Sequence, residues 1–443
     1  MRIKLSDHFT YSKLLRFVFP SIIMMIFTSI YGVVDGLFVS NFAGKTAFAS
    51  INLVMPFVMI LGGIGFMIGT GGTALVSKVL GEGNKDKANK IFTMMIIFTL
   101  LLGALLSVIG VISMPWVAKF LGATEAMMED CILYGRIVTG FTVAFMLQSV
   151  FQSFLIAAEK PKLGLLATML AGCTNMVLDA VFIIVFNWGV AGAAIATGLS
   201  QCVGGIFPLI YFLRKNSSLL RLTKTKLEIK PILNACGNGS SELMSNISSS
   251  VVSMIYNFQL MKYVGEDGVS AYGVLMYVQF IFVAIYIGYA IGCAPITGYH
   301  FGAQNHNELK NMLRKSSFLS AVSGVVLTVL AIVLSSPLAK LFVGYDEELY
   351  ELTRHAFRLF AYSFLLAGFN IFTSSFFTAL NNGAVSAAIS FMRTLIFQTS
   401  SVLILPIFLG VDGIWWAITV AEFFAFILSL IFLFAKRKKY NYI

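Results

Sequence analysis

The sequence carries little charge for its length. Only 12% of its 443 residues are Asp, Glu, Lys or Arg, whereas soluble domains carry about 25%. By contrast, 58% of the residues are hydrophobic, and apolar runs of about 20 residues, long enough to cross a bilayer as a helix, recur along the whole chain. This composition excludes a single large soluble domain and indicates a multi-pass membrane protein.

Residues that form metal sites and disulfides are also scarce. The five cysteines are scattered, mostly inside apolar runs, and the four histidines lie in or beside expected loops, so neither type shows a ligand spacing. No nucleophile–base motif and no repeated filter sequence is present. These absences argue against a membrane-embedded enzyme and against a channel. We expect no enzymatic activity and no cofactor.

Alternating hydrophobicity is missing as well. Membrane spans must be helices or closed barrels, because lipid satisfies no backbone polar group, and the continuous apolar runs favour helices. The first run is too long for a signal peptide and lacks a clear cleavage site, so we treat it as a span. We predict an all-α membrane protein with twelve transmembrane helices at residues 15–41, 49–78, 91–114, 133–157, 163–186, 190–213, 233–260, 270–298, 316–339, 355–380, 385–408 and 413–435.

The basic residues concentrate in every second loop. With the amino-terminus in the cytoplasm, about three quarters of the 31 Lys and Arg residues fall on the cytoplasmic side, as the positive-inside rule requires. Both termini are then cytoplasmic, in agreement with an even number of spans. The net charge of +11 is therefore explained by topology, and we expect no nucleic-acid partner.

An internal repeat appears when the sequence is shifted by 221 residues. The shift superposes Gly71 on Gly292, Gly81 on Gly302, and Asn84 on Asn305. Chance similarity between glycine-rich helices is the alternative, but the register is nearly constant along the chain. We predict two six-helix lobes, 1–213 and 233–443, joined by a cytoplasmic linker, 214–232. Because six is even, the lobes share one orientation, with a pseudo-twofold axis along the membrane normal.

Two acids lie deep in spans of the first lobe. A carboxylate at the centre of a membrane helix costs roughly 2.5–3.5 kcal/mol, so such residues usually have a function. Asp35 lies roughly 30 Å along the first span and Asp179 roughly 25 Å along the fifth, which places both in the outer half. Tyr31 and Asn175 lie one turn from these acids, and Thr197 reaches the same depth in the sixth span. These five side chains therefore form our candidate ion-coupling site.

Two carboxylates in a poorly solvated pocket cannot both be ionised cheaply. Such a pair can hold a proton, or Na⁺ with neighbouring oxygens as further ligands. The alternative is a structural role, with the carboxylates satisfied by donors of neighbouring helices. Under the repeat, Tyr256 replaces Asp35 and Ser400 replaces Asp179. Since the second lobe lacks the pair, the asymmetry favours a functional role in the first.

The second lobe has different charges at depth. Glu242 and Arg393 each lie roughly 15 Å from the cytoplasmic end of their spans. We interpret them as an ion pair, with separate roles as the alternative; Glu422 is an isolated acid in the last span. Candidates for a substrate cavity are Met146, Gln148, Gln152, Tyr256, Tyr277, Phe280, Glu242 and Arg393.

These features together resemble the multidrug and toxic compound extrusion (MATE) family. The resemblance rests on SIYGVVDGLFVS around Asp35, NMVLDAVFI with Asn175 and Asp179, and KVLGEGNKDKA at the end of the second span. It covers essentially the whole chain, including the duplication. Members of the NorM-like branch carry acids further along helix 7 and in helix 10. Here Glu242 comes earlier and helix 10 has no acid, which favours coupling through the first lobe, as in the DinF-like or MepA-like bacterial members.

The resemblance implies export of lipophilic organic cations in exchange for H⁺ or Na⁺ by alternating access. We expect a monomer in the bacterial cytoplasmic membrane, with small cationic molecules and the lipid bilayer as its partners. The alternative is a flippase or exporter of lipid-linked saccharides. Such a protein needs a basic cavity for pyrophosphate, and Arg393 is the main basic residue at mid-depth.

Overall fold

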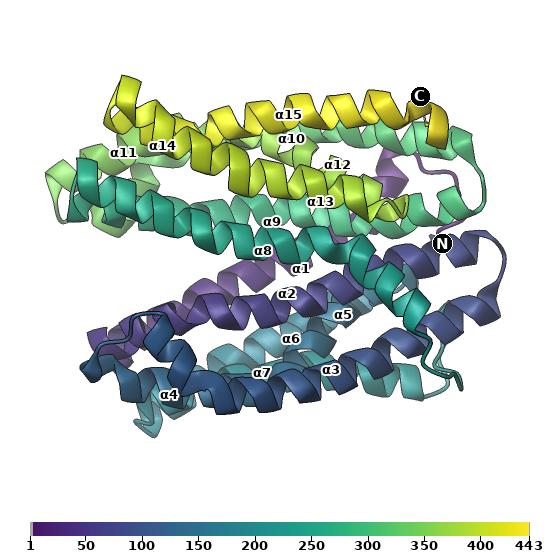
Figure 1. Ribbon diagram of the computed structural model, residues 1–443, viewed down its shortest axis with the longest axis horizontal. Helices are drawn as coiled ribbons and strands as arrows, with labels where there is room; N and C mark the ends of the chain where they lie inside the picture. Colours follow the sequence, from purple (N-terminus) through teal and green to yellow (C-terminus); the bar gives the residue numbers. More distant parts are fainter. Residues whose placement is uncertain (1–2, 443) are drawn as a thin grey trace.

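The computed structural model describes residues 3–442, and these fold almost entirely into helices. The first half contains α1 (Tyr11–Phe38), α2 (Lys45–Gly81), α3 (Lys85–Phe120), α4 (Glu125–Gly140), α5 (Thr142–Ala157), α6 (Pro161–Asp179) and α7 (Gly189–Leu213). The second half contains α8 (Ile229–Tyr263), α9 (Glu266–Gly302), α10 (His306–Val343), α11 (Glu347–Ala361), α12 (Phe364–Ala379), α13 (Gly383–Phe391), α14 (Gln398–Leu409) and α15 (Val411–Tyr440). Three π-helices, η1 (Val39–Ala43), η2 (Ala180–Val185) and η3 (Met392–Phe397), continue α1, α6 and α13. Figure 1 shows the two halves as separate bundles that lie along each other.

Within residues 3–442, nine helices are long and apolar enough to cross a membrane, and two bent helix pairs raise the number to eleven. The one predicted span outside these eleven is the seventh, α8, which is 35 residues long but rich in Ser, Asn and Gly. Its length suffices for a span, while its polarity indicates that one face avoids lipid. Each of the twelve predicted segments thus corresponds to a helix or to a helix with a break.

Both bent pairs are breaks that the sequence did not predict. The fourth span bends by 54° between α4 and α5, and the tenth by 49° between α11 and α12. Hydroxyl groups of other helices satisfy the carbonyls that the breaks release: Ser107 Oγ donates to Thr139 O at 2.7 Å, and Thr328 Oγ1 donates to Ala361 O at 3.3 Å. Ser107 and Thr328 are repeat partners, so both copies stabilise the break in the same way.

The two lobes meet at the end of the molecule that carries the chain termini. At Gly81 of α2, a β-carbon would lie 1.9 Å from Tyr299 O of α9, and at Gly302 of α9 a β-carbon would lie 1.9 Å from Lys78 O of α2. Only glycine allows this approach. The internal repeat exchanges these two contacts, as expected if α2 and α9 cross on the pseudo-twofold axis.

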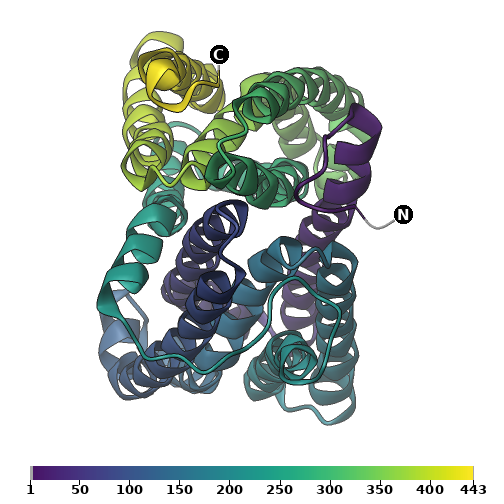
Figure 2. The ribbon, with the colours of Figure 1, turned by 90° about the vertical axis from the view of Figure 1, so that its right-hand side faces the viewer.

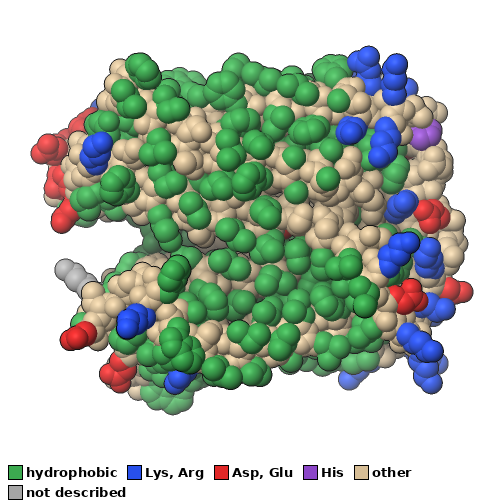
Figure 3. Space-filling view, in the orientation of Figure 1, with side chains coloured by type: hydrophobic (Ala, Val, Ile, Leu, Met, Phe, Trp, Pro, Cys, Tyr) green, Lys and Arg blue, Asp and Glu red, His purple; other side chains and the backbone are tan. Residues whose placement is uncertain are grey.

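At the opposite end the lobes separate. Figure 3 shows a deep hollow between them on that side, while Lys and Arg gather at the closed end, where Figure 1 places both termini. The main contacts between the lobes join α1 and α2 of the first lobe to α8 and α9 of the second. The structure is thus open at one end only.

Two connecting segments dock at the closed end. The linker between α7 and α8 crosses the end of the first lobe (Figure 2), where Arg221 N donates to Asn89 Oδ1 and Thr223 N to Thr93 Oγ1, both at 2.9 Å. The segment before α1 packs against the second lobe, because Phe9 is fully buried and its backbone N–H donates to Glu308 Oε1 at 2.9 Å. Our lobe boundaries at 213 and 233 remain a prediction, with α8 beginning four residues earlier, at Ile229.

Candidate functional site

The structure brings the predicted acidic pair together in the first lobe. Asp35 lies near the end of α1, and Asp179 is the last residue of α6. The Asp35 carboxylate interacts with the side chains of both Asp179 and Asn175. Asp179 and Asn175 are buried, at 0% and 1% exposure, and Asp35 is half-buried. Three of the five predicted site residues therefore converge at one depth.

The other two predicted residues lie beside this pair. Tyr31, one turn below Asp35 on α1, is close enough to interact with it. Thr197 of α7 interacts with the phenol of Tyr134, and that phenol also lies close enough to both aspartates to interact with their charges. Tyr134, on α4, was not predicted, although an aromatic hydroxyl at this depth in the fourth span was the signal that could have revealed it.

Most buried oxygens of this site lack a hydrogen-bond partner in the described part of the chain. No partner within residues 3–442 bonds Asp35 Oδ1, Asn175 Oδ1, Thr197 Oγ1 or either carboxylate oxygen of Asp179. Buried acceptors left in this state are costly unless a proton or a cation satisfies them. A purely structural role for Asp179, with helix donors around its carboxylate, does not agree with this geometry. The arrangement can hold a proton between the carboxylates, or Na⁺ among the oxygens.

π-Helical turns adjoin the charged residues of both lobes. η2 begins directly after Asp179, η1 begins four residues after Asp35, and η3 contains Arg393. π-Bulges are rare and occur mostly at functional sites, because they shift side chains out of the regular helical register. The widened turn is therefore part of how α1 and α6 present the two acids.

Arg393 pairs with Glu422, and our prediction of a pair with Glu242 was wrong. Arg393 Nε lies 2.9 Å from both Glu422 oxygens, and its Nη2 lies 2.6 Å from Oε1. Asn370 Nδ2 donates to Glu422 Oε2 at 2.7 Å, and Ser429 Oγ donates to Asn370 Oδ1 at 3.2 Å. Depth matching could not distinguish the two acids, because the direction in which η3 points its side chain decides the partner.

Glu242 instead lies on α8 where this helix packs against α2, at the interface between the lobes. It lies one turn beyond Gly239, where α8 packs against Met67 O of α2, and one turn before Asn246, which contacts α2 at Gly63. Its side chain is half-buried, and its carboxylate has no ion pair or hydrogen bond to the rest of the described chain. A lone carboxylate at the interface between the lobes can attract a cation.

Four of the other cavity candidates are buried within their own lobes. Met146, Gln148 and Gln152 are at most 5% exposed and lie inside the first lobe, so they do not line the hollow. Tyr256 is 2% exposed and stacks on Tyr272 with ring centres 5.0 Å apart.

Two aromatic candidates on α9 also differ from each other. Tyr277 stacks on Phe342 of α10, within its own lobe. Phe280 is 63% exposed, and its carbonyl accepts a hydrogen bond from Ser29 Oγ of α1 at 3.2 Å, across the lobe interface. Of the aromatic candidates, Phe280 is therefore the one that the structure leaves accessible.

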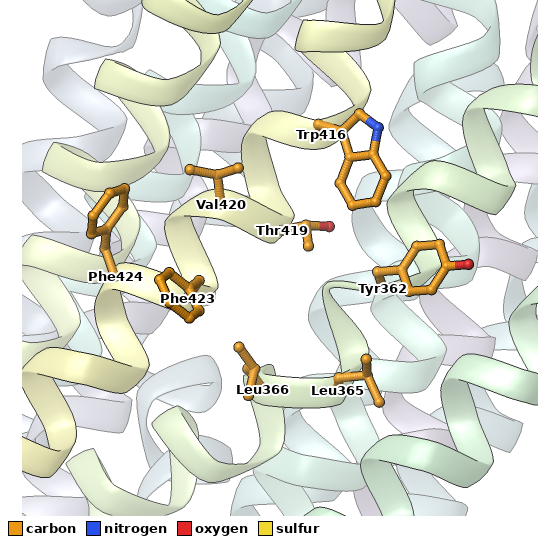
Figure 4. A pocket seen from close by; sticks show the side chains of 8 residues that line it. All are labelled: Tyr362, Leu365, Leu366, Trp416, Thr419, Val420, Phe423 and Phe424. Atoms are coloured by element: carbon orange, nitrogen blue, oxygen red, sulfur yellow. The ribbon is translucent and has the colours of Figure 1, made fainter.

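A separate apolar pocket lies between α12 and α15, away from the acidic pair. Figure 4 shows the side chains that line it, with Tyr362 and Trp416 on one side and Phe423 and Phe424 on the other; its volume is about 430 Å³. The lining contains no charged residue. It is a surface groove on the apolar exterior of the second lobe.

The fold and the site define a class: a helical membrane protein of two repeated lobes, with a buried acidic pair in one of them. The sequence model of the MatE family matches residues 20–181 and 243–401, well over half of the chain and once in each repeat. The chain therefore belongs to the MATE family of transporters.

Known members resemble the chain over nearly its full length. It is 23% identical over 435 residues to the multidrug export protein MepA of Staphylococcus haemolyticus (strain JCSC1435), covering 97% of this chain and 94% of that one. It is 22% identical over 437 residues to MepA of Staphylococcus aureus (strain MSSA476), with the same coverage.

Solved structures agree on the fold. An outward-facing multidrug resistance MATE transporter of the MOP superfamily superposes with a TM-score of 0.93, at 22% identity and 98% coverage of both chains. A MOP superfamily transporter from Pyrococcus furiosus superposes with a TM-score of 0.90, at 22% identity and 98% coverage of this chain and 97% of the other.

Proposed function

We propose that the protein is a secondary antiporter that exports lipophilic organic cations in exchange for H⁺ or Na⁺. The observation that carries the proposal is the pair Asp35 and Asp179. Three of its four carboxylate oxygens have no hydrogen-bond partner among the described residues, and the pair has no counterpart in the second lobe. Tyr31, Asn175 and Thr197 complete the ion site. The coupling ion neutralises the pair, and its release into the cytoplasm drives the change of conformation.

The substrate enters the hollow between the lobes. Glu242, at the interface of α8 and α2, attracts the cationic group, and exposed apolar side chains such as Phe280 contact the rest of the substrate. One charge crossing a potential of 100 mV is worth about 2.3 kcal/mol, which is a useful drive for export. The multidrug export proteins of Staphylococcus, which the chain resembles over its full length, support drugs as the substrate class.

The chain acts as a monomer in a bacterial cytoplasmic membrane, with both termini inside. The closed end, which carries the termini and most basic residues, then faces the cytoplasm, and the hollow opens outward. Export of lipid-linked saccharides is the less favoured alternative. It needs free basic residues at mid-depth, and the main one, Arg393, is neutralised by Glu422.

Asp35→Asn and Asp179→Asn test the proposal in proteoliposomes. Each should abolish gradient-driven drug uptake while the protein stays folded and binds the drug, because a neutral amide cannot take up the coupling ion. Asp412→Asn is the matched control, since Asp412 is half exposed at the start of α15 and pairs with His355. Full gradient-driven transport by Asp35→Asn would refute the assignment.

A further inference from the structure

Below the acidic pair, the first lobe contains a column of buried polar side chains with no assigned role. Gln148 and Gln152 on α5 are each 5% exposed, Gln201 on α7 is 8% exposed, and Thr168 on α6 is 1% exposed. The side-chain oxygen of each glutamine lacks a hydrogen-bond partner in the described part of the chain. Buried polar oxygens normally bond to protein or to ordered water, so the column marks a place where protein donors alone do not suffice.

The column follows the helices toward the closed end. On α6, Asp179, Asn175 and Thr168 are spaced by four and seven residues and therefore share one face. On α5, Gln148 and Gln152 are one turn apart, and Gln152 Nε2 donates to Thr168 Oγ1 at 3.4 Å. The distance along α6 from Asp179 to Thr168 is roughly 16 Å, which is about half the thickness of the bilayer core.

Two contacts hold Gln148 in this column. At Gly204 of α7, a β-carbon would lie 2.7 Å from Gln148 Cδ, so a larger residue would displace the amide. Gln148 also contacts the phenol of Tyr31, which lies beside Asp35. Tyr31 and Gln148 therefore connect the acidic pair to Gln152 and Thr168 without a gap in polarity.

An apolar contact closes the lower end of the column. One turn below Thr168, a β-carbon at Gly164 would lie 3.6 Å from both Met24 Sδ of α1 and Leu155 Cβ of α5. Met24 and Leu155 are each 1% exposed. On α6 the polar face is interrupted at Gly172, which packs against the rings of Phe27 and Tyr31. The column therefore reaches Thr168 through Gln148 and Gln152 of α5, and it is then sealed on the side of the chain termini.

We propose that Tyr31, Gln148, Gln152 and Thr168 form the path by which the coupling proton leaves the acidic pair for the cytoplasm, and that Met24 and Leu155 are its gate. This inference rests on the proposed function. Water between the amides and hydroxyls carries the proton: one enters at the pair and one leaves at the gate, and no side chain of the path changes its charge. Acidic side chains inside membranes mark proton relays, and the acidic pair stands at the start of this path, while the amides and hydroxyls hold the water that continues it.

Few other ionisable groups influence the start of the path. Tyr31 of α1 and Tyr134 of α4 interact with the acidic pair. The groups that act on the two carboxylates are Asn175 of α6 and the other acid of the pair, Asp35 on α1 or Asp179 on α6. No basic side chain is among the groups that interact with the pair in the described chain. The pair therefore exchanges its proton with solvent rather than with a lysine or arginine.

Proton flux into liposomes that contain a pH-sensitive dye tests the path. Gln152→Leu should slow drug-coupled proton flux roughly tenfold and leave the drug affinity unchanged. Gln259→Leu is the matched control, because Gln259 on α8 is 7% exposed and also has an unpartnered side-chain oxygen, but lies in the other lobe. Normal flux in Gln152→Leu would overturn the proposal.

Met24→Ser provides a second test, which needs no drug. A hydroxyl in place of the thioether should let water cross the gate, so this variant should leak protons several-fold faster than wild type. A Met24→Ser protein that leaks protons no faster than wild type would overturn both the gate and the path. If wild type exchanges drug only for Na⁺, the proton path fails and the antiport proposal stands. If wild type moves no drug at all, the proposed function fails, and the proton leak of Met24→Ser still decides the path.

Discussion

Replacing Arg393 alone should destabilise the protein more than replacing Arg393 and Glu422 together. The guanidinium makes two-pronged contacts of 2.6–2.9 Å with the Glu422 carboxylate. The Glu422 side chain is 2% exposed and that of Arg393 17%. In Arg393→Met, the buried carboxylate keeps only Asn370 as a side-chain donor.

The size of the effect follows from the burial of Glu422. Removing one partner of a buried pair costs roughly 3–5 kcal/mol, because an uncompensated charge remains. Glu422→Gln should cost less, roughly 1–3 kcal/mol, since Arg393 is the more exposed partner and the Asn370 bond can persist. In the double variant Arg393→Met/Glu422→Gln no charge is left, so we expect a loss below about 2 kcal/mol.

Thermal unfolding of the purified proteins in one detergent, followed by tryptophan fluorescence, compares the four proteins. The account predicts that wild type is the most stable, that the double variant follows, and that Arg393→Met is the least stable. A double variant that melts at or below the temperature of Arg393→Met would show that the pair does not work by charge compensation.

Three further outcomes follow. Glu242→Gln should weaken binding of cationic drugs roughly tenfold and leave the binding of neutral analogues unchanged. An equal loss of affinity for cationic and neutral ligands in equilibrium binding would contradict a role for the charge. Gly302→Leu should force the lobes apart at the closed end, seen as longer distances between spin labels there, whereas Gly237→Leu, with open space around it, should not. Burial raises the pKa of Asp7, but hydrogen bonds and charges of two nearby lysines outweigh it and leave the pKa below its usual range. That contribution is present above about pH 3.9 and is lost as the pH falls through the lowered pKa. Asp7→Asn should therefore loosen the segment before α1 by less than about 1 kcal/mol at pH 7 and not at pH 2, as measured by hydrogen exchange; equal loosening at both would refute the linkage.

Arguments about depth succeeded where helix length alone sets position. Asp35 and Asp179 were placed together from the rise per residue along two spans of the same direction, and in the structure the two side chains lie close enough to interact. The repeat likewise identified Gly81 and Gly302, which turned out to be the contact between the lobes. Both features depend on spacing along the chain, and spacing is visible in a sequence.

Features that depend on helix rotation were not predictable. Arg393 and Glu242 have matching depths, yet η3 turns the guanidinium toward α15 and Glu422. The break between α4 and α5 was also missed, because Ser107 of another helix satisfies the released carbonyls. Met146 is apolar and flexible like a cavity residue, but it is fully buried in the first lobe.

Drug uptake by wild-type protein in proteoliposomes, under pH and Na⁺ gradients imposed separately, tests the central claim most directly. If the acidic pair couples ion entry to export, one of the two gradients should drive uptake against a drug gradient, and Asp35→Asn should abolish that drive while drug binding persists. Uptake that follows only the drug's own gradient, unchanged by either ion and equal in wild type and Asp35→Asn, would contradict the account.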